Sequence, residues 1–165
     1  MPTPEAVSKL QQLFSEDQLK VDWAGKDLVL DVDCDSMKKL CLFLRRDPDF
    51  DYDFLVDLTS WDIGESFPLW YRLYSMRFNH TVLIRTNVSR DNPIIASVTD
   101  IWPGADWLER ECFDMYGIDF EGHPFQGDLA QMRILMPKDW DGFPFRKDYE
   151  PVFSGDPLHG PQERN

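Results

Sequence analysis

The chain has 165 residues, of which 42% are hydrophobic, 28% charged and 14% aromatic. That length suits one domain with its own hydrophobic core, and the composition argues against disorder over most of the chain. Because 30 Asp and Glu residues outnumber 17 Lys and Arg residues, the net charge of -13 repels nucleic-acid phosphates and anionic membrane surfaces, which argues against nucleic-acid binding.

The first half of the chain has an α, β, β, α pattern. Thr3 is a predicted N-cap with Pro4 at the first helical position, and apolar residues follow at helical spacing. Two strands, 20–23 and 28–32, flank a turn that contains glycine and aspartate and is typical of a hairpin. Ser36 then predicts the cap of a second helix, which ends at an Asp-Pro-Asp break.

Three more strands are predicted after this break, at 54–61, 69–77 and 81–88, and the last two form a hairpin. Apolar side chains alternate onto both faces of the second of these strands, which favours a sheet covered on both sides. A third helix is predicted from Ala105 or Asp106 to Tyr116. Its C-terminal cap is Gly117, a residue that readily adopts the left-handed conformation.

After this glycine no long periodic pattern remains, and prolines at positions 124, 137, 144, 151, 157 and 161 argue against an extended helix. We therefore predict an α+β fold with an antiparallel or mixed sheet of about five strands and three helices in residues 1–118. An extended irregular arm, residues 119–165, belongs to the same structural unit. Long structureless stretches are usually functional or ordered by a partner, so we expect this arm to dock onto one.

The cysteines, the N-terminal sequence and the apolar runs indicate the compartment and the relation to membranes. Cys34, Cys41 and Cys112 form no CxxC pair and are odd in number, so neither a disulfide framework nor a cysteine-ligated cluster is indicated, and a reducing compartment fits. The N-terminal sequence has no cationic start followed by an apolar run, so no import or export signal is expected. The longest apolar runs fall well short of the roughly 18 residues that span a bilayer. Membrane association is expected only through partners.

Charged residues on the predicted third helix are spaced for specific contacts. Asp106 and Arg110 lie one turn apart with the acid first, which is the favourable order for a helical pair. Glu111 and Asp114 share a face and repel each other unless a cation lies between them. Three downstream residues are the candidate basic partners within the chain: Arg133, Arg146 and Lys147.

Together these positions form a motif of acids, bases, glycines and a proline. Its members are Glu109, Arg110, Glu111, Asp114, Gly117, Gly122, His123, Pro124, Arg133, Ile134, Leu135, Arg146, Lys147, Asp148 and Tyr149. The motif resembles the signature of the 30 kDa-type peripheral-arm subunit of respiratory complex I, the NADH:quinone oxidoreductase. Supporting stretches upstream extend the resemblance over residues 25–151.

Two departures from the family pattern stand out. Residues 125–132 intervene between the His-Pro and Arg-Ile-Leu parts of the motif, where the family usually has only a few residues, so a loop has grown there. Phe143 stands where the family commonly has histidine or tryptophan. A packing role is therefore expected at this position in place of a polar one.

The resemblance implies a structural and assembly subunit in the peripheral arm of a proton-translocating NADH:quinone oxidoreductase. Such a subunit has no catalytic, cofactor-binding or metal-binding residues of its own, and FMN, iron-sulfur clusters and quinone are expected in partner subunits. The implied partners are the hydrogenase-like quinone-site subunit and neighbouring iron-sulfur subunits, at the cytoplasmic face of the bacterial inner membrane. The motif residues are then interface residues that fix the register between chains.

Other functions stay open at this point. The alternative is the same scaffold role in a related membrane-bound hydrogenase, or in a ferredoxin- or deazaflavin-driven dehydrogenase, because nothing in the sequence identifies the electron donor. A free-standing enzyme with Glu111 and Asp114 as an acid/base pair is a further alternative. The motif acids could also form only a solvated helix face. His80, His123 and His159 are scattered and predict no shared metal site, and His123 is predicted to be a hydrogen-bonded turn residue.

Overall fold

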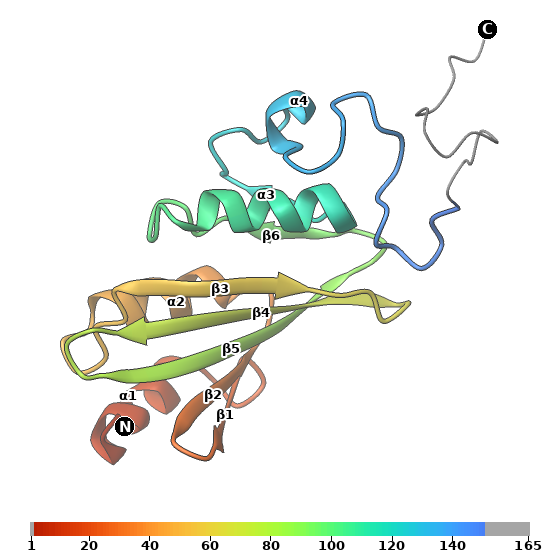
Figure 1. The fold of residues 1–165 in the computed structure, drawn as a ribbon. Coiled ribbons are helices and arrows are strands. Elements are labelled where there is room, and N and C mark those ends of the chain that lie inside the picture. Colours follow the sequence, from red (N-terminus) through yellow and green to blue (C-terminus); the bar gives the residue numbers. More distant parts are fainter. Residues whose placement is uncertain (1, 151–165) are drawn as a thin grey trace, which may run out of the picture.

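The computed structural model describes residues 2–150, and its centre is a five-stranded mixed sheet (Figure 1). In chain order the elements are α1 Pro4–Leu13, β1 Leu19–Ala24, β2 Asp27–Val32, α2 Met37–Arg46, β3 Phe54–Ser60, β4 Ser66–Ser75, β5 His80–Ser89, β6 Ile94–Ala96, α3 Ala105–Tyr116, β7 Asp119–Glu121 and α4 Leu129–Met132. The strand order is β1-β2-β5-β4-β3. The β2–β5 pair is parallel and the other three are antiparallel. The α+β fold and the mixed five-stranded sheet are therefore confirmed.

Local signals account for the helix ends, with one exception. The Thr3 hydroxyl oxygen accepts the Ala6 N–H at 3.2 Å, so the predicted cap of α1 is confirmed. The predicted Ser36 cap of α2 is wrong, because its side chain makes no capping bond and the Asp33 carboxylate accepts the Ser36 N–H at 2.8 Å. Helix α3 ends at Gly117 with φ +71°, as predicted.

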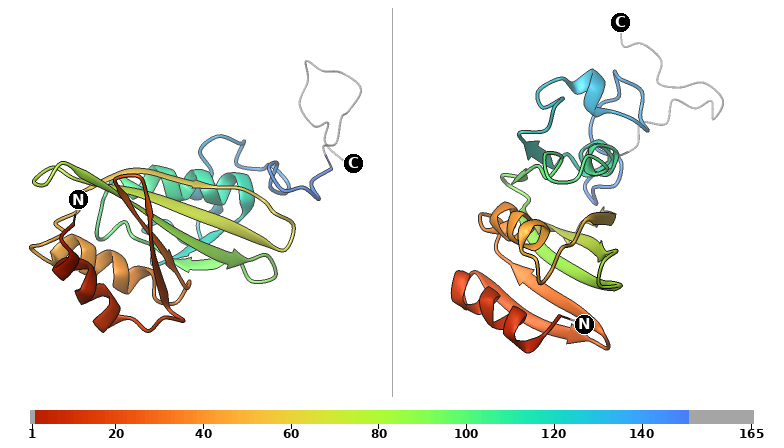
Figure 2. Two further views of the ribbon diagram at one scale, coloured as in Figure 1. Left: turned by 90° about the horizontal axis from the view of Figure 1, so that it is seen from below. Right: turned by 90° about the vertical axis from the view of Figure 1, so that its left-hand side faces the viewer.

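One face of the sheet carries the core. Leu30, Tyr71 and Ile84 on this face are fully buried and belong to one cluster with Leu10 of α1 and Leu40 of α2. Both helices lie on this side of the sheet in two perpendicular views (Figures 1 and 2). Apolar burial of this kind is the main source of stability.

The opposite face of the sheet is open in residues 2–150, so the expectation of two covered faces is wrong. Trp70 and Tyr74 are half-buried there and Arg72 is exposed. The open face is held by cross-strand contacts, since the Arg85 guanidinium donates to the Asp31 carboxylate at 2.6 Å and lies 5.9 Å from the Trp70 ring centre. Aromatic side chains covered by charged neighbours produced the ambiguous sequence pattern.

The chain beyond α3 has more order than predicted. Strand β7 pairs in parallel with β6, so the chain returns beside the segment that precedes α3. Helix α4 is a single turn, and the Asp128 carboxylate accepts the Gln131 N–H at 3.2 Å at its start. Elements this short leave no detectable periodicity, which is why both were missed.

Residues 133–150 contain no helix or strand, as predicted for the arm. The division into 1–118 and 119–165 stays a prediction, and residues 151–165, including His159, lie outside the described residues. None of the helices in the described part of the chain has the length and apolar character required to cross a membrane.

Candidate functional site

The motif residues gather around α3, which lies along the β3 side of the sheet (Figure 1). Residues 133–149, called the strap below, run over this helix and reach the loop after β3. The strap has no secondary structure of its own, so its position depends on side-chain contacts. Two aspartates and one arginine anchor it at three points.

Asp114 is the first anchor of the strap. Its fully buried carboxylate accepts a 2.7 Å hydrogen bond from the Arg133 guanidinium and bonds of 2.7 to 3.0 Å from the N–H groups of Ile134, Leu135 and Met136. Burial opposes ionisation of Asp114, but these N–H groups and the guanidinium hold its pKa below the ordinary value. Arg133 also donates to the carbonyl oxygens of residues 140 and 142, which folds the strap back on itself.

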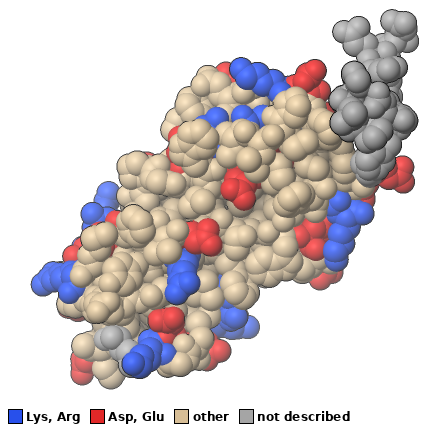
Figure 3. All heavy atoms as spheres, in the orientation of Figure 1, with Lys and Arg blue, Asp and Glu red and all other residues tan. Residues whose placement is uncertain are grey.

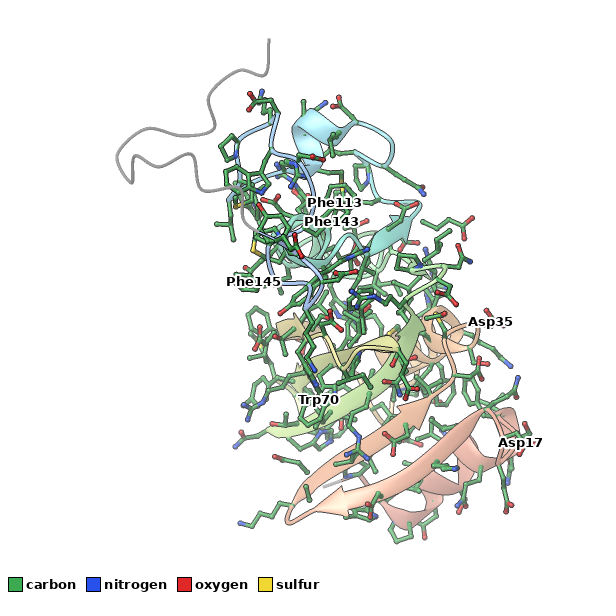
Figure 4. All side chains as sticks on the ribbon, turned by 90° about the vertical axis from the view of Figure 1, so that its right-hand side faces the viewer. Asp17, Asp35, Trp70, Phe113, Phe143 and Phe145 are labelled. Atoms are coloured by element: carbon green, nitrogen blue, oxygen red, sulfur yellow. The ribbon has the colours of Figure 1, made fainter. Side chains whose placement is uncertain are left out.

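The second anchor is at the C-terminal end of α3. The Arg146 guanidinium donates to the Tyr116 carbonyl oxygen at 2.6 Å, and its centre lies 4.7 Å from the Phe143 ring and 5.1 Å from the Phe67 ring. A cation at this position complements the free carbonyl groups of a helix end. Phe143 thus has the packing role expected for it. Figure 4 shows it beside Phe113 and above Phe145.

The third anchor joins the strap to the loop after β3. The buried Asp62 carboxylate accepts the Lys147 N–H at 2.8 Å and the Arg90 guanidinium at 2.7 Å, and Arg90 also pairs with Asp148 at 2.6 Å. Burial opposes ionisation, but Arg90 and the N–H groups of Lys147 and Gly64 lower the pKa of Asp62 to about 2. Sequence reasoning missed Asp62 and Arg90 as site residues. The only signal was that Asp62 ends a stretch resembling the same family.

Glu109 connects α3 to the segment after β6. Its fully buried carboxylate accepts the Ser97 hydroxyl and the Val98 N–H, each at 2.7 Å. Burial raises the pKa of Glu109 to about 7, although both hydrogen bonds favour the ionised form. No basic residue pairs with this carboxylate within residues 2–150. It is a buried group that titrates near neutrality.

Asp106, Arg110 and His123 form a smaller cluster at the N-terminal half of α3. The Asp106 carboxylate lies 4.0 Å from the Arg110 guanidinium and 3.1 Å from Nε2 of the buried His123. Nδ1 of His123 accepts the Phe125 N–H at 3.1 Å, so it carries no proton. Arg110 lies between the Trp107 and Phe125 rings, at 4.9 and 5.2 Å. His123 is therefore a hydrogen-bonded turn residue, as predicted.

The remaining motif residues face outward or pack locally. Glu111, Gly122, Pro124 and the Lys147 side chain are exposed. The ring of Tyr149 lies against Gly142, where an added Cβ atom would approach it to 3.1 Å.

The motif therefore contains mainly intrachain contacts, and few of its side chains are free to react. Asp114 pairs with Arg133, one of the basic partners expected for it, whereas Glu111 takes part in no ion pair in the described part of the chain. These two carboxylates do not form an acid/base pair, because one is buried in four hydrogen bonds and the other faces outward. Residues 2–150 contain no cluster of three or more His, Cys, Asp and Glu side chains able to hold a metal ion. Burial raises the pKa of the Cys41 and Cys112 thiols, so both stay protonated.

Gly117 is the position where this packing is least tolerant of a side chain. A Cβ atom there would lie 2.4 Å from a Phe143 ring carbon and 2.7 Å from an Arg146 nitrogen, and φ is +71°. We expect Gly117→Ala to lower the free energy of unfolding by roughly 2 to 4 kcal/mol, from left-handed strain and overpacking together. Urea unfolding measures this loss.

Gly122→Ala is the matched control, because Gly122 has φ +82° but open space around it. Its free energy of unfolding should fall only by the cost of left-handed strain, about 1 kcal/mol. Equal losses in the two variants would show that Phe143 and Arg146 do not pack on Gly117.

Comparison with known proteins identifies the family. The family model for the "Respiratory-chain NADH dehydrogenase, 30 Kd subunit" matches residues 30–153, which is more than half of the chain. An NADH-quinone oxidoreductase subunit of Roseiflexus castenholzii is 38% identical over 151 residues, which cover 90% of this chain and 84% of that protein. The corresponding subunit of Trichlorobacter lovleyi is 37% identical over 163 residues, which cover 96% of this chain and 92% of that protein.

A solved structure shows the same fold. It is part of the membrane-bound sulfane sulfur reductase, an archaeal respiratory membrane complex, and matches with a TM-score of 0.70 over 90% of this chain and 85% of that chain. Its sequence is 20% identical, so this likeness concerns the fold alone. The resemblance of the motif is confirmed by the family match. The chain belongs to the family of the respiratory-chain NADH dehydrogenase 30 Kd subunit, which includes these NADH-quinone oxidoreductase subunits.

Proposed function

We propose that this chain is a non-catalytic structural and assembly subunit in the peripheral arm of a proton-translocating NADH:quinone oxidoreductase. The observation that carries the proposal is the similarity to the NADH-quinone oxidoreductase subunits of two bacteria, which extends along nearly the whole chain. The chain docks onto the quinone-site subunit and neighbouring iron-sulfur subunits at the cytoplasmic face of the inner membrane. FMN, the iron-sulfur clusters and the quinone are bound by those partners.

The geometry around α3 supports a scaffold role. Asp62, Asp114 and Arg146 fix an irregular strap to the folded body, so its outer surface is presented in one conformation. Leu135 and Phe145 on the strap are 61% and 59% exposed. Large apolar side chains on a fixed backbone are typical anchors in protein interfaces, because little conformational entropy is lost on binding.

Affinity purification of the chain from its native membranes tests this proposal. We expect the other oxidoreductase subunits to co-purify and the preparation to show the visible absorption of flavin and iron-sulfur clusters. NADH should reduce those clusters. Recovery of the chain alone, as a colourless monomer, would refute the assembly role.

A second candidate is the same scaffold role in a related membrane-bound complex with another electron donor. The fold shared with part of the sulfane sulfur reductase complex favours it. If reduced ferredoxin or a reduced deazaflavin, and not NADH, reduces the clusters of the purified complex, this candidate replaces the first.

A further inference from the structure

We propose that the open side of the sheet, together with the adjacent side of α3, is a docking surface for a partner-subunit segment that carries arginine or lysine beside apolar side chains. We define this docking surface by Asp57, Trp61, Trp70, Trp107, Glu111 and Phe145. The inference rests on the proposed function, since it names the surface and the partner chemistry through which that assembly occurs.

Exposed apolar side chains supply the first argument. Trp107 is 63% exposed, Phe145 59% and Trp61 36%, and the Trp61 and Trp70 rings meet edge to face with centres 5.0 Å apart. The space-filling view of this side is mostly uncharged in its middle, where a few acidic and basic groups lie, while most charged side chains lie toward its margins (Figure 3). Such a face is unusual on a chain with this many charges and is typical of an interaction site.

These side chains form one surface because local contacts connect them. Trp107 and Glu111 lie one turn apart on α3. Asp57 lies on β3, the strand of the sheet against which α3 packs. Asp57 and Trp70 line the same hollow on the sheet. Trp61 precedes Asp62, whose bond to the Lys147 N–H brings it near Phe145.

The hollow explains what the surface can accept. Its volume is about 370 Å³, and its apolar lining includes Val29, Leu83 and Trp70. Asp27, Asp57 and Arg72 supply its charged groups. This space fits the apolar stem of a long side chain whose charged end reaches the carboxylates at the edge.

Charge selects a basic partner. Asp57 and Glu111 are exposed and form no ion pair in the part of the chain that the structure describes, and the half-buried Asp27 forms none there either. Asp27 and Asp57 line the hollow with one guanidinium, that of Arg72, and Glu111 lies on the adjacent helix. The Arg85 guanidinium on the same face is paired with Asp31, and the chain has a net charge of -13. An arginine or lysine from a partner would bind these carboxylates.

Photocrosslinking within the native complex tests the location. Benzoylphenylalanine is placed at position 145 or 107 and, as a control, at position 17. Asp17 lies on the α1 and α2 side, away from Trp70 and Phe145 (Figure 4). We expect positions 145 and 107 to crosslink to another subunit, at a peptide that contains arginine or lysine, and position 17 to give no such product. A complex that co-purifies but crosslinks only from position 17 would overturn this inference and leave the proposed function standing.

Charge reversal tests the partner chemistry. The double variant Asp57→Lys with Glu111→Lys should reduce the co-purified partner subunits at least about tenfold, because like charges then face each other. Asp17→Lys with Asp35→Lys makes the same change in net charge on the other side of the molecule and should give the wild-type yield. Far-UV circular dichroism and a thermal melt of each variant confirm folding. A wild-type yield from the Asp57/Glu111 variant would overturn the charge assignment.

Discussion

Replacing Asp114 by alanine is expected to lower the free energy of unfolding by roughly 3 to 5 kcal/mol, because removing one partner of a buried ion pair leaves the other charge uncompensated. The Arg133 guanidinium would stay buried with its main acceptor gone, and the N–H groups of three consecutive strap residues would lose theirs. Urea unfolding measures the loss. Glu111→Ala on the same helix is the matched control, since its carboxylate is exposed, and it should change stability by less than about 0.5 kcal/mol.

The same substitution should release the strap before the protein unfolds globally. Lys138 lies in the strap five residues after Arg133, so trypsin should cut there much faster in Asp114→Ala than in Glu111→Ala under native conditions. The double variant Asp114→Asn with Arg133→Met should lose less free energy of unfolding than its two single variants lose together, because neither charge is then buried without its partner. Additive losses and unchanged proteolysis would mean that this pair does not anchor the strap.

The fold was predictable where a local signal and a packing signal agree. Thr3 followed by Pro4, the Gly25 turn and Gly117 after an apolar helix each fix an element end through backbone chemistry that few residues offer. The parallel β2–β5 pair was not predictable, because it joins strands almost fifty residues apart and no local signal encodes that pairing. The start of α2 illustrates a third case. Ser36 and Asp33 both have a side-chain oxygen that could accept an N–H group there, and in the structure it is Asp33 that accepts one.

The motif was recognisable, but the direction of its side chains was not. Helical spacing puts Glu111 and Asp114 on neighbouring positions of one face, and both looked equally able to reach a partner. The strap covers Asp114 and leaves Glu111 in solvent, so Asp114 anchors the strap and Glu111 does not. The sequence of a coil segment without periodicity does not predict which part of the fold the segment will cover. This is also why the contribution of Asp62, far upstream, could not be assigned.

Buried carboxylates in the same small region illustrate how environment sets ionisation. Asp62 and Asp114 accept several N–H groups and an arginine, and their pKa values fall. Glu109 is equally buried but has two donors and no cation, so burial dominates and its pKa rises to about 7. The first two stabilise the fold as anions. The third stabilises it best when it is protonated.

Glu109 should therefore make the chain less stable as the pH rises toward neutrality. Its pKa is higher in the folded state than in the unfolded state, so its contribution is fully present below about pH 4.5 and is lost as the pH rises through about 7. The full effect is about 3 kcal/mol. Glu109→Gln keeps the size of the side chain and an acceptor for the Val98 N–H, but it cannot ionise.

Urea unfolding of both proteins from pH 4.5 to 8 isolates this contribution, because other titrating groups cancel in the difference. The stability of Glu109→Gln relative to wild type should rise by about 3 kcal/mol between pH 4.5 and 8. Glu111→Gln, an exposed carboxylate on the same helix, should show no such trend. A flat difference for Glu109→Gln would mean that the pKa of Glu109 is the same in the folded and unfolded states, so that the bonds from Ser97 and Val98 offset its burial. The predicted slope instead means that burial of the ionised Glu109 carboxylate lowers the stability of the fold within the physiological pH range.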